Sequence, residues 1–123
     1  MKCVFCKKIE EGSIKDEGAG VCSFEPLNPV TKGHLLIVSY NHNPDFTHSQ
    51  AESANAMAIA SKLAKNMGDV NLITSKGENA TQTIQHLHIH LVPRRKNDGL
   101  KLPWSPTPKP ASQRGEPKVK GKR

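Results

Sequence analysis

The chain has 123 residues, enough for one globular domain, with 35% hydrophobic residues and a formal net charge of +7. Its apolar runs are too short for a membrane span, its first residues lack the apolar core of a secretory leader, and three cysteines are too few for a secreted disulfide framework. We therefore expect a cytoplasmic protein. The charge is uneven, because residues 105–123 hold six Lys or Arg and one Glu.

The N-terminal segment carries Cys3 and Cys6 in a Cys-x-x-Cys pattern. This spacing holds two thiols on one turn, which suits zinc, and it also occurs in redox-active thiols. The redox motif needs a surrounding strand–helix–strand pattern that this sequence lacks. A short helix is predicted from Phe5 to Glu11. The remaining alternative is a pair of small thiols without a ligand role.

Hydrophobic periodicity in the middle of the chain predicts strands and one long helix. The strands are expected at residues 21–24, 34–39 and 69–75, with a turn or short edge strand at residues 13–20. The helix is expected over Thr47–Met67, where apolar side chains recur at helical spacing. Two overlapping capping patterns, Thr47-x-x-Gln50 and Ser49-x-x-Glu52, fit its start. This helix should cover the apolar face of the sheet.

The most informative segment is Gln82–Arg94, in which His86, His88 and His90 alternate with Leu87, Ile89 and Leu91. Read with a period of two, it is a strand with one apolar face and one imidazole face. Imidazole can act as a nucleophile, a proton carrier or a zinc ligand near neutral pH. Three rings on one face favour a functional site over the alternatives, which are a decorated edge strand or a fortuitous metal-binding run.

These motifs resemble the histidine triad (HIT) superfamily of nucleotide hydrolases and nucleotidyl transferases, and in particular its Hint-like branch. The matching elements occur in the family's order: Cys3–Cys6, Phe24–Pro29, Gly33–Val38, and His86–His90 with Gln82 before it and Pro93-Arg94 after it. The resemblance implies an α+β fold, with an antiparallel sheet of about five strands, one long helix and one short helix. It predicts a HIT domain over residues 1–104. The basic, proline-rich residues 105–123 are too poor in apolar side chains to form a core, so we expect them to be disordered.

The resemblance also implies the chemistry, which is attack on the α-phosphorus of a nucleoside phosphate derivative. His88, the central ring, is the candidate nucleophile and would form a nucleotidyl-histidine that water then hydrolyses. The other rings of the triad, His86 and His90, complete the candidate catalytic set. Two-step transfer through a histidine requires no catalytic metal.

Zinc-binding members of the superfamily complete their site with a histidine after the glycine-histidine strand and with the first histidine of the triad. Those positions are His42 and His86 in this sequence. The resemblance therefore predicts a structural zinc on Cys3, Cys6, His42 and His86.

The resemblance assigns the nucleotide pocket to residues that precede and flank the triad. The candidate substrate-binding residues are Phe24, Leu27, Asn28, His34, Ser75, Gln82, Thr83 and His90. Simple core packing is the alternative for Phe24 and Leu27. The sequence departs from common family forms at two other positions, where Pro26 replaces an acidic residue and Thr81 replaces a glycine.

Proteins of this size in the superfamily are usually homodimers, so a homodimer is expected, with Trp104 able to reach the partner's site. The basic tail could contact nucleic acid weakly and non-specifically. The competing function is a zinc-stabilised, non-catalytic module that binds nucleotides or nucleic acid. The intact triad favours the enzyme, whereas Pro26 and Thr81 favour the module.

Overall fold

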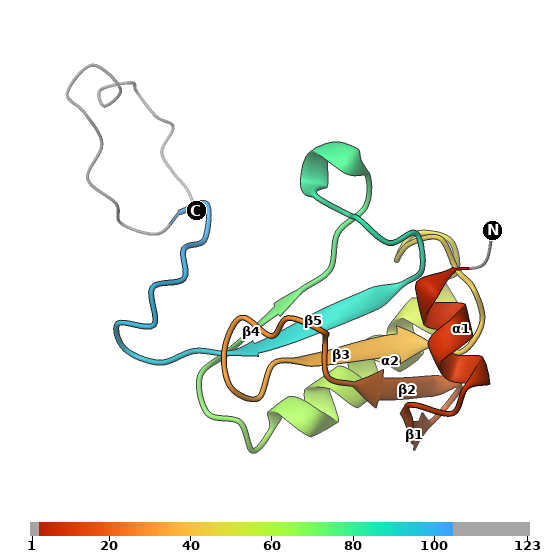
Figure 1. Cartoon of the computed structure of the whole chain (residues 1–123), viewed down its shortest axis with the longest axis horizontal. Coiled ribbons are helices and arrows are strands. Elements are labelled where there is room, and N and C mark those ends of the chain that lie inside the picture. The colour runs from red at the N-terminus through yellow and green to blue at the C-terminus, as the bar shows by residue number, and fades with distance from the viewer. Residues whose placement is uncertain (1–2, 105–123) are drawn as a thin grey trace.

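One antiparallel sheet of five strands organises the computed structural model, which describes residues 3–104 (Figure 1). In spatial order the strands are β1 (Lys15–Gly18), β2 (Val21–Phe24), β3 (Leu35–Ser39), β5 (His88–Pro93) and β4 (Val70–Ile73). The α+β class and the five-stranded sheet predicted from the sequence are confirmed. The predicted tail, residues 105–123, lies outside the described residues. Between residues 3 and 104, no helix has the length and apolar character needed to span a membrane.

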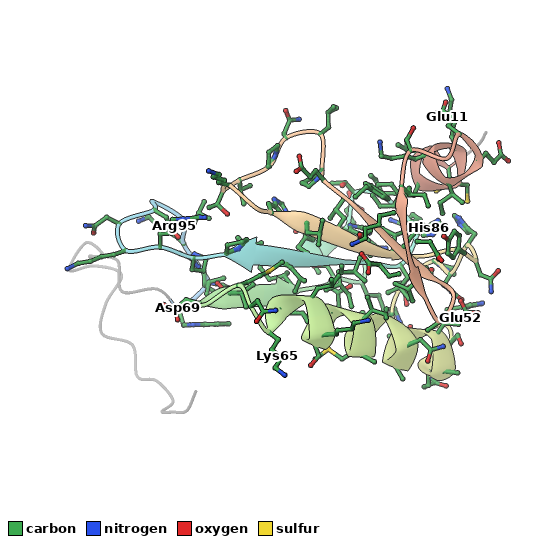
Figure 2. All side chains as sticks on the ribbon, turned by 90° about the horizontal axis from the view of Figure 1, so that it is seen from below. Glu11, Glu52, Lys65, Asp69, His86 and Arg95 are labelled. Carbon is green, nitrogen blue, oxygen red and sulfur yellow. The ribbon has the colours of Figure 1, made fainter. Side chains whose placement is uncertain are left out.

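Two helices lie on opposite sides of this sheet, α1 (Val4–Glu10) and α2 (Gln50–Ala64) (Figure 2). On the α2 side, the helix buries Ala56, Ile59 and Ala60 against side chains of the three central strands and Leu87. The other face has a smaller apolar cluster, formed by Phe5, Cys22, Leu36 and Val38. The sheet is therefore covered on both faces, and α1 covers the face that carries the histidines.

The long helix begins later than the sequence pattern predicts. Its N-cap is Ser49, whose side chain accepts a hydrogen bond of 3.2 Å from the backbone of Glu52. Thr47 instead closes a turn on Asp45, through a backbone hydrogen bond of 2.8 Å to the carboxylate. The Glu52 carboxylate does not complete a capping box, since it accepts from Asn41 and Asn43.

The triad strand is also shorter than predicted, because β5 begins at His88 rather than before His86. The backbone N–H of Leu87 donates to the carbonyl of Asn43 at 2.6 Å, and that of His86 donates to Ile84 at 2.9 Å. These contacts bend the chain ahead of the sheet. The alternation of faces still holds, as Leu87, Ile89 and Leu91 enter the core beneath α2. His86 is therefore aligned with the other two rings in sequence but does not belong to their strand.

Candidate functional site

Three histidine rings meet on the sheet face opposite α2. His88 and His90 project from β5, and their ring centroids are 5.1 Å apart. His34, which immediately precedes β3, brings its Nε2 to 3.0 Å from Nδ1 of His90. The antiparallel pairing of β3 with β5 creates this group, because it sets Leu36 opposite His90 and Val38 opposite His88.

The ring of His88 has a defined tautomer. Its Nδ1 lies 2.7 Å from the backbone carbonyl oxygen of His86, and a carbonyl can only accept. Nδ1 therefore carries the proton and Nε2 has a free lone pair. Burial lowers the pKa of His88 below its usual value, which keeps the ring neutral near pH 7. A neutral imidazole with its lone pair fixed on Nε2 is suited to nucleophilic attack.

The ring of His90 has the opposite tautomer. The backbone N–H of Val30 donates to Nδ1 of His34 at 3.1 Å, so a neutral His34 carries its proton on Nε2. That proton is donated to Nδ1 of His90, which leaves His90 with its own proton on Nε2. Burial, with smaller contributions from His88 and His34, lowers the pKa of His90 to about 4. A lone pair on His88 and a donor on His90 are thus fixed side by side.

A cavity of about 860 Å³ opens beside these rings. Its lining includes all of the residues expected to bind substrate, together with His88: Phe24, Leu27, Asn28, His34, Ser75, Gln82, Thr83 and His90. Leu27 is 94% exposed, which excludes the core-packing alternative for this residue. Phe24 fits both the substrate-binding and the core-packing interpretation, since it lines the cavity and packs edge-on against Phe5 with centroids 5.3 Å apart.

Gln82 lines the cavity, but its amide is committed to the loop around it. The side-chain oxygen accepts from the backbone of Gly77 at 2.9 Å, and the nitrogen donates to the carbonyls of Pro44 at 2.8 Å and Ile84 at 3.1 Å. Both donor protons are therefore used, and the residue is buried. Its geometry indicates that Gln82 holds the loop beside the cavity rather than binding a phosphate through its amide.

A second group of side chains, Cys3, Cys6, His42 and His86, lies next to the rings. One ligand atom from each residue lies within 4.8 Å of all the others. The sulfur-to-Nδ1 distances are 3.4 Å for Cys3–His86, 3.3 Å for Cys6–His42 and 3.6 Å for Cys6–His86. Tetrahedral zinc, bonded at about 2.3 Å to sulfur and about 2.1 Å to nitrogen, separates these atoms by about 3.6 Å. The four residues could therefore hold a metal ion.

The tautomer of His86 supports the same conclusion. Its Nε2 lies 2.7 Å from the backbone carbonyl oxygen of Ser39, so the proton is on Nε2 and the lone pair of Nδ1 faces the thiols. The ring is completely buried, and burial lowers its pKa. Both ring nitrogens are engaged away from the cavity, so this geometry gives no support to the predicted catalytic role of His86.

The HIT domain model matches residues 15–97 of this chain. The chain belongs to the HIT family. An adenosine 5′-monophosphoramidase of Saccharomyces cerevisiae is 35% identical over 109 residues, which are 83% of this chain and 69% of that protein. An adenylylsulfatase of Arabidopsis thaliana is 32% identical over 109 residues, 80% of this chain and 55% of that protein. The structure of a HIT family protein from Bacillus anthracis superposes with a TM-score of 0.67 and 32% identity, covering 84% of this chain and 81% of that one.

Two residues that the sequence did not indicate are central to this HIT site. Phe5 is buried and touches the cavity, and its ring packs edge-on against both His86 and His88. Asn43 is also buried; its carbonyl accepts the backbone N–H of Leu87 within the triad segment, and its amide nitrogen donates to the carboxylate of Glu52 at 2.8 Å. The position of Phe5 between the two cysteines was an available signal. Nothing in the sequence distinguishes Asn43 from an ordinary loop residue.

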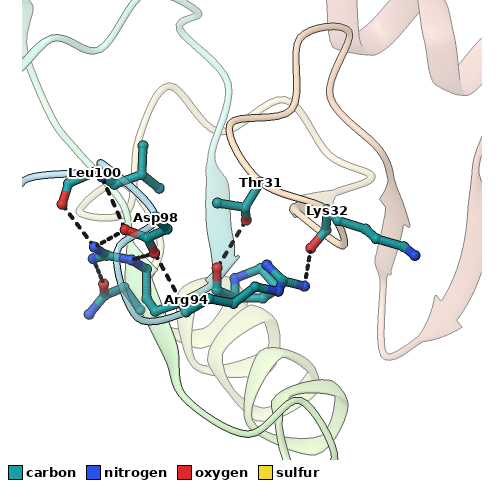
Figure 3. A network of polar contacts seen from close by, with 8 residues as sticks. Thr31, Lys32, Arg94, Asp98 and Leu100 are labelled. Carbon is teal, nitrogen blue, oxygen red and sulfur yellow. Dashed lines mark hydrogen bonds and ion pairs between the residues drawn. The ribbon is translucent and has the colours of Figure 1, made fainter.

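The loop that carries His34 is fixed to the end of the triad strand (Figure 3). The hydroxyl of Thr31 donates to the carbonyl of Pro93 at 3.0 Å, and the guanidinium of Arg95 donates to the carbonyl of Lys32 at 3.1 Å. These bonds hold the loop whose Val30 N–H sets the tautomer of His34. The tautomer of His90 is therefore supported from outside the cavity.

The same figure shows how the chain turns after β5. The guanidinium of Arg94 donates to both carboxylate oxygens of Asp98, at 2.7 and 2.9 Å, and also to Asn71 and to the carbonyl of Leu100. The hydrogen bonds from Arg94, with those from the backbone of Arg95 and Leu100, hold the pKa of Asp98 well below its usual value. This network stabilises the end of the HIT domain, beyond the cavity.

Proposed function

We propose that this HIT protein is a hydrolase that cleaves nucleoside phosphoramidates or related derivatives at the α-phosphorus. The observation that carries the proposal is the pair of opposite tautomers on β5, a lone pair at Nε2 of His88 and a donor at Nε2 of His90. The names of the yeast and plant relatives, an adenosine 5′-monophosphoramidase and an adenylylsulfatase, point to a nucleoside monophosphate carrying a variable leaving group. A non-catalytic binding module would not require this arrangement.

In the first step, Nε2 of His88 attacks the α-phosphorus. The new P–N bond forms while the bond to the leaving group breaks, and an amine leaving group takes up a proton from solvent as it departs. The hydrogen bond from Nδ1 of His88 to the carbonyl of His86 stabilises the positive charge that develops on the ring. The Nε2–H of His90 stabilises the charge on the departing atom or on a phosphate oxygen.

In the second step, water attacks phosphorus and breaks the P–N bond. The nucleoside monophosphate leaves, one proton is released, and Nε2 of His88 regains its lone pair. The apolar wall formed by Phe24, Leu27 and Ile84 can accept the base, and Asn28, Ser75 and Thr83 offer polar groups at the cavity edge. We assign Gln82 and His34 to positioning, the first for the loop and the second for the ring of His90.

We further propose that a structural zinc occupies the cluster of Cys3, Cys6, His42 and His86. When bound, the metal joins α1 to the segment that leads into β5, and it takes no part in the chemical steps. The distances and the tautomer of His86 support this proposal. Elemental analysis of protein purified without chelator should find about one zinc per chain, and protein with no zinc would contradict it.

The HIT domain proposed for residues 1–104 is expected to form a homodimer through an exposed sheet edge. β4 is an end strand of the described sheet, and its Leu72 and Ile73 are each 38% exposed. A second copy of the chain would cover these side chains and pair the free edge. Analytical ultracentrifugation should give the mass of a dimer, whereas Leu72→Lys should give a monomer.

The test of the function is a substrate panel. The protein should release nucleoside monophosphate from adenosine or guanosine phosphoramidates, adenylyl sulfate or dinucleoside polyphosphates. His90→Ala should reduce turnover, with His48→Ala, a change at a histidine away from the cavity, as the control. If metal-loaded protein turned over none of these substrates, the hydrolase proposal would be refuted and the binding module favoured.

A further inference from the structure

The ring of Phe5 lies between the metal cluster and the candidate nucleophile. Its centroid is 5.8 Å from that of His86, at an interplanar angle of 76°, and 5.1 Å from that of His88, at 82°. It also packs against Phe24, which lines the cavity, and is itself only 5% exposed. One side chain therefore contacts a metal-cluster residue, the nucleophile and the wall of the substrate cavity.

The helix that carries Phe5 is too short to be stable by itself. α1 has seven residues, and isolated helices of this length do not persist in water. Cys3 is its N-cap, and Sγ accepts a bond of 3.4 Å from the backbone of Cys6. The same sulfur lies 3.4 Å from Nδ1 of His86. The start of α1 is thus held through a thiol that belongs to the metal cluster.

A second connection runs through the main chain of His86. Its ring faces the thiols through Nδ1, while its carbonyl oxygen accepts the hydrogen bond of 2.7 Å from Nδ1 of His88. A shift of His86 therefore moves the acceptor that fixes the nucleophile's tautomer. Phe5 and this carbonyl contact the same ring of His88 by independent routes.

We propose that Phe5 is a positioning residue through which occupancy of the metal cluster controls the active site. With a metal bound, α1 is held in place and Phe5 fixes both the ring of His88 and one wall of the cavity. Without the metal, a hydrogen bond between the Cys3 thiol and His86 still joins α1 to the segment that leads into β5. This bond is weaker than metal coordination, so α1 separates from the sheet more often. Nucleotide affinity and turnover then fall together, although the metal contacts neither the nucleotide nor the ring of His88. This inference rests on the proposed function for its effect on turnover.

The cluster is open on one side, which makes the proposal testable without disturbing the cavity. His42 is exposed, its Nδ1 lies 3.3 Å from Sγ of Cys6, and its ring packs edge-on against the ring of His86 with centroids 4.9 Å apart. His42→Ala removes one ligand together with this ring contact, and metal-stripped wild-type protein, which keeps the contact, separates the two effects. His48 is another exposed histidine, so His48→Ala is the matched control.

The experiment measures bound metal, hydrogen exchange of residues 4–10, AMP affinity by calorimetry, and the ¹⁵N resonances of His88. For His42→Ala we expect metal affinity to fall by about 100-fold, and α1 exchange and the Kd for AMP each to rise by about tenfold. The sharp Nδ1–H signature of His88 should broaden. His48→Ala should match the wild type in all four measurements.

Phe5→Leu distinguishes the effect of losing the aromatic ring from the effect of losing the metal. This variant keeps an apolar side chain in the core and should retain the metal, yet its AMP affinity should fall by about fivefold, and added zinc should not restore it. Unchanged α1 exchange and AMP affinity in metal-stripped wild-type protein would overturn the proposal, and so would wild-type AMP affinity in Phe5→Leu. These measurements need no turnover, so they decide the coupling even if the substrate panel refutes the hydrolase.

Discussion

Thr81 should be a stability defect that one substitution can repair. It follows the short 3₁₀ turn Glu78–Ala80 at the cavity edge, with φ of 65°, in the left-handed region that a β-branched residue rarely adopts. Such strain costs about 1–3 kcal/mol. Glycine removes it but adds about 0.5–1 kcal/mol of chain entropy to the unfolded state. The hydroxyl of Thr81 bonds only to the neighbouring carbonyl of Ala80 among the described contacts, so its loss costs little.

Thr81→Gly is therefore expected to increase the free energy of unfolding by about 1 kcal/mol, which raises the melting temperature of a domain of this size by about 4 °C. Thermal and urea unfolding, followed by circular dichroism at equal metal loading, would measure it. Asn97→Gly is the matched control, since Asn97 has φ of 62° but asparagine tolerates this region. A lower melting temperature for Thr81→Gly, or an equal gain for Asn97→Gly, would refute the reasoning.

Three further outcomes are expected. The free energy of unfolding should fall as the pH drops from 6.5 towards 4, because His90 takes up a proton at its usual pKa when unfolded but only at about 4 when folded. The protonation of His90 should lower the free energy of unfolding by about 2 kcal/mol after allowance for its partial exposure. A free energy of unfolding, measured by urea denaturation, that does not change over this pH range would contradict this. Asp98→Ala should lower the melting temperature clearly more than Lys15→Ala, since Lys15 is 74% exposed and Asp98 binds Arg94 through both carboxylate oxygens. In chelator-treated protein, iodoacetamide should leave Cys22 unmodified at about pH 8, because burial raises its pKa to about 11, and rapid alkylation of this thiol would contradict the stated cause.

Elements with a strong local pattern could be predicted from the sequence. Alternation defined the strand face formed by Ile89 and Leu91, and helical spacing defined α2, because both signals arise from which side chains enter the core. The first and last residues of these elements were harder to predict. The pattern extended the triad strand back to His86, whereas hydrogen bonds to Asn43 and Ile84 bend the chain there. Such bonds depend on segments far apart in sequence, which periodicity does not reveal.

The site shows the same division. The residue types of the triad and of Cys3 and Cys6 indicated chemistry, because imidazoles and thiols at these spacings have few other uses. The tautomers could not be predicted, since they depend on a backbone N–H from Val30 and a carbonyl from His86. The commitment of the Gln82 amide to backbone groups was hidden for the same reason.

The central claim is that His88 becomes covalently nucleotidylated. The most direct measurement is rapid-quench mass spectrometry of the wild-type protein during turnover of an adenosine phosphoramidate, with His88→Asn in parallel. We predict one adenylyl group on the peptide that contains His88, and neither adduct nor turnover in His88→Asn, because a carboxamide cannot form the intermediate. His88→Asn should still fold and bind AMP. Wild-type turnover by this variant, or an adenylyl group on another residue, would contradict the account.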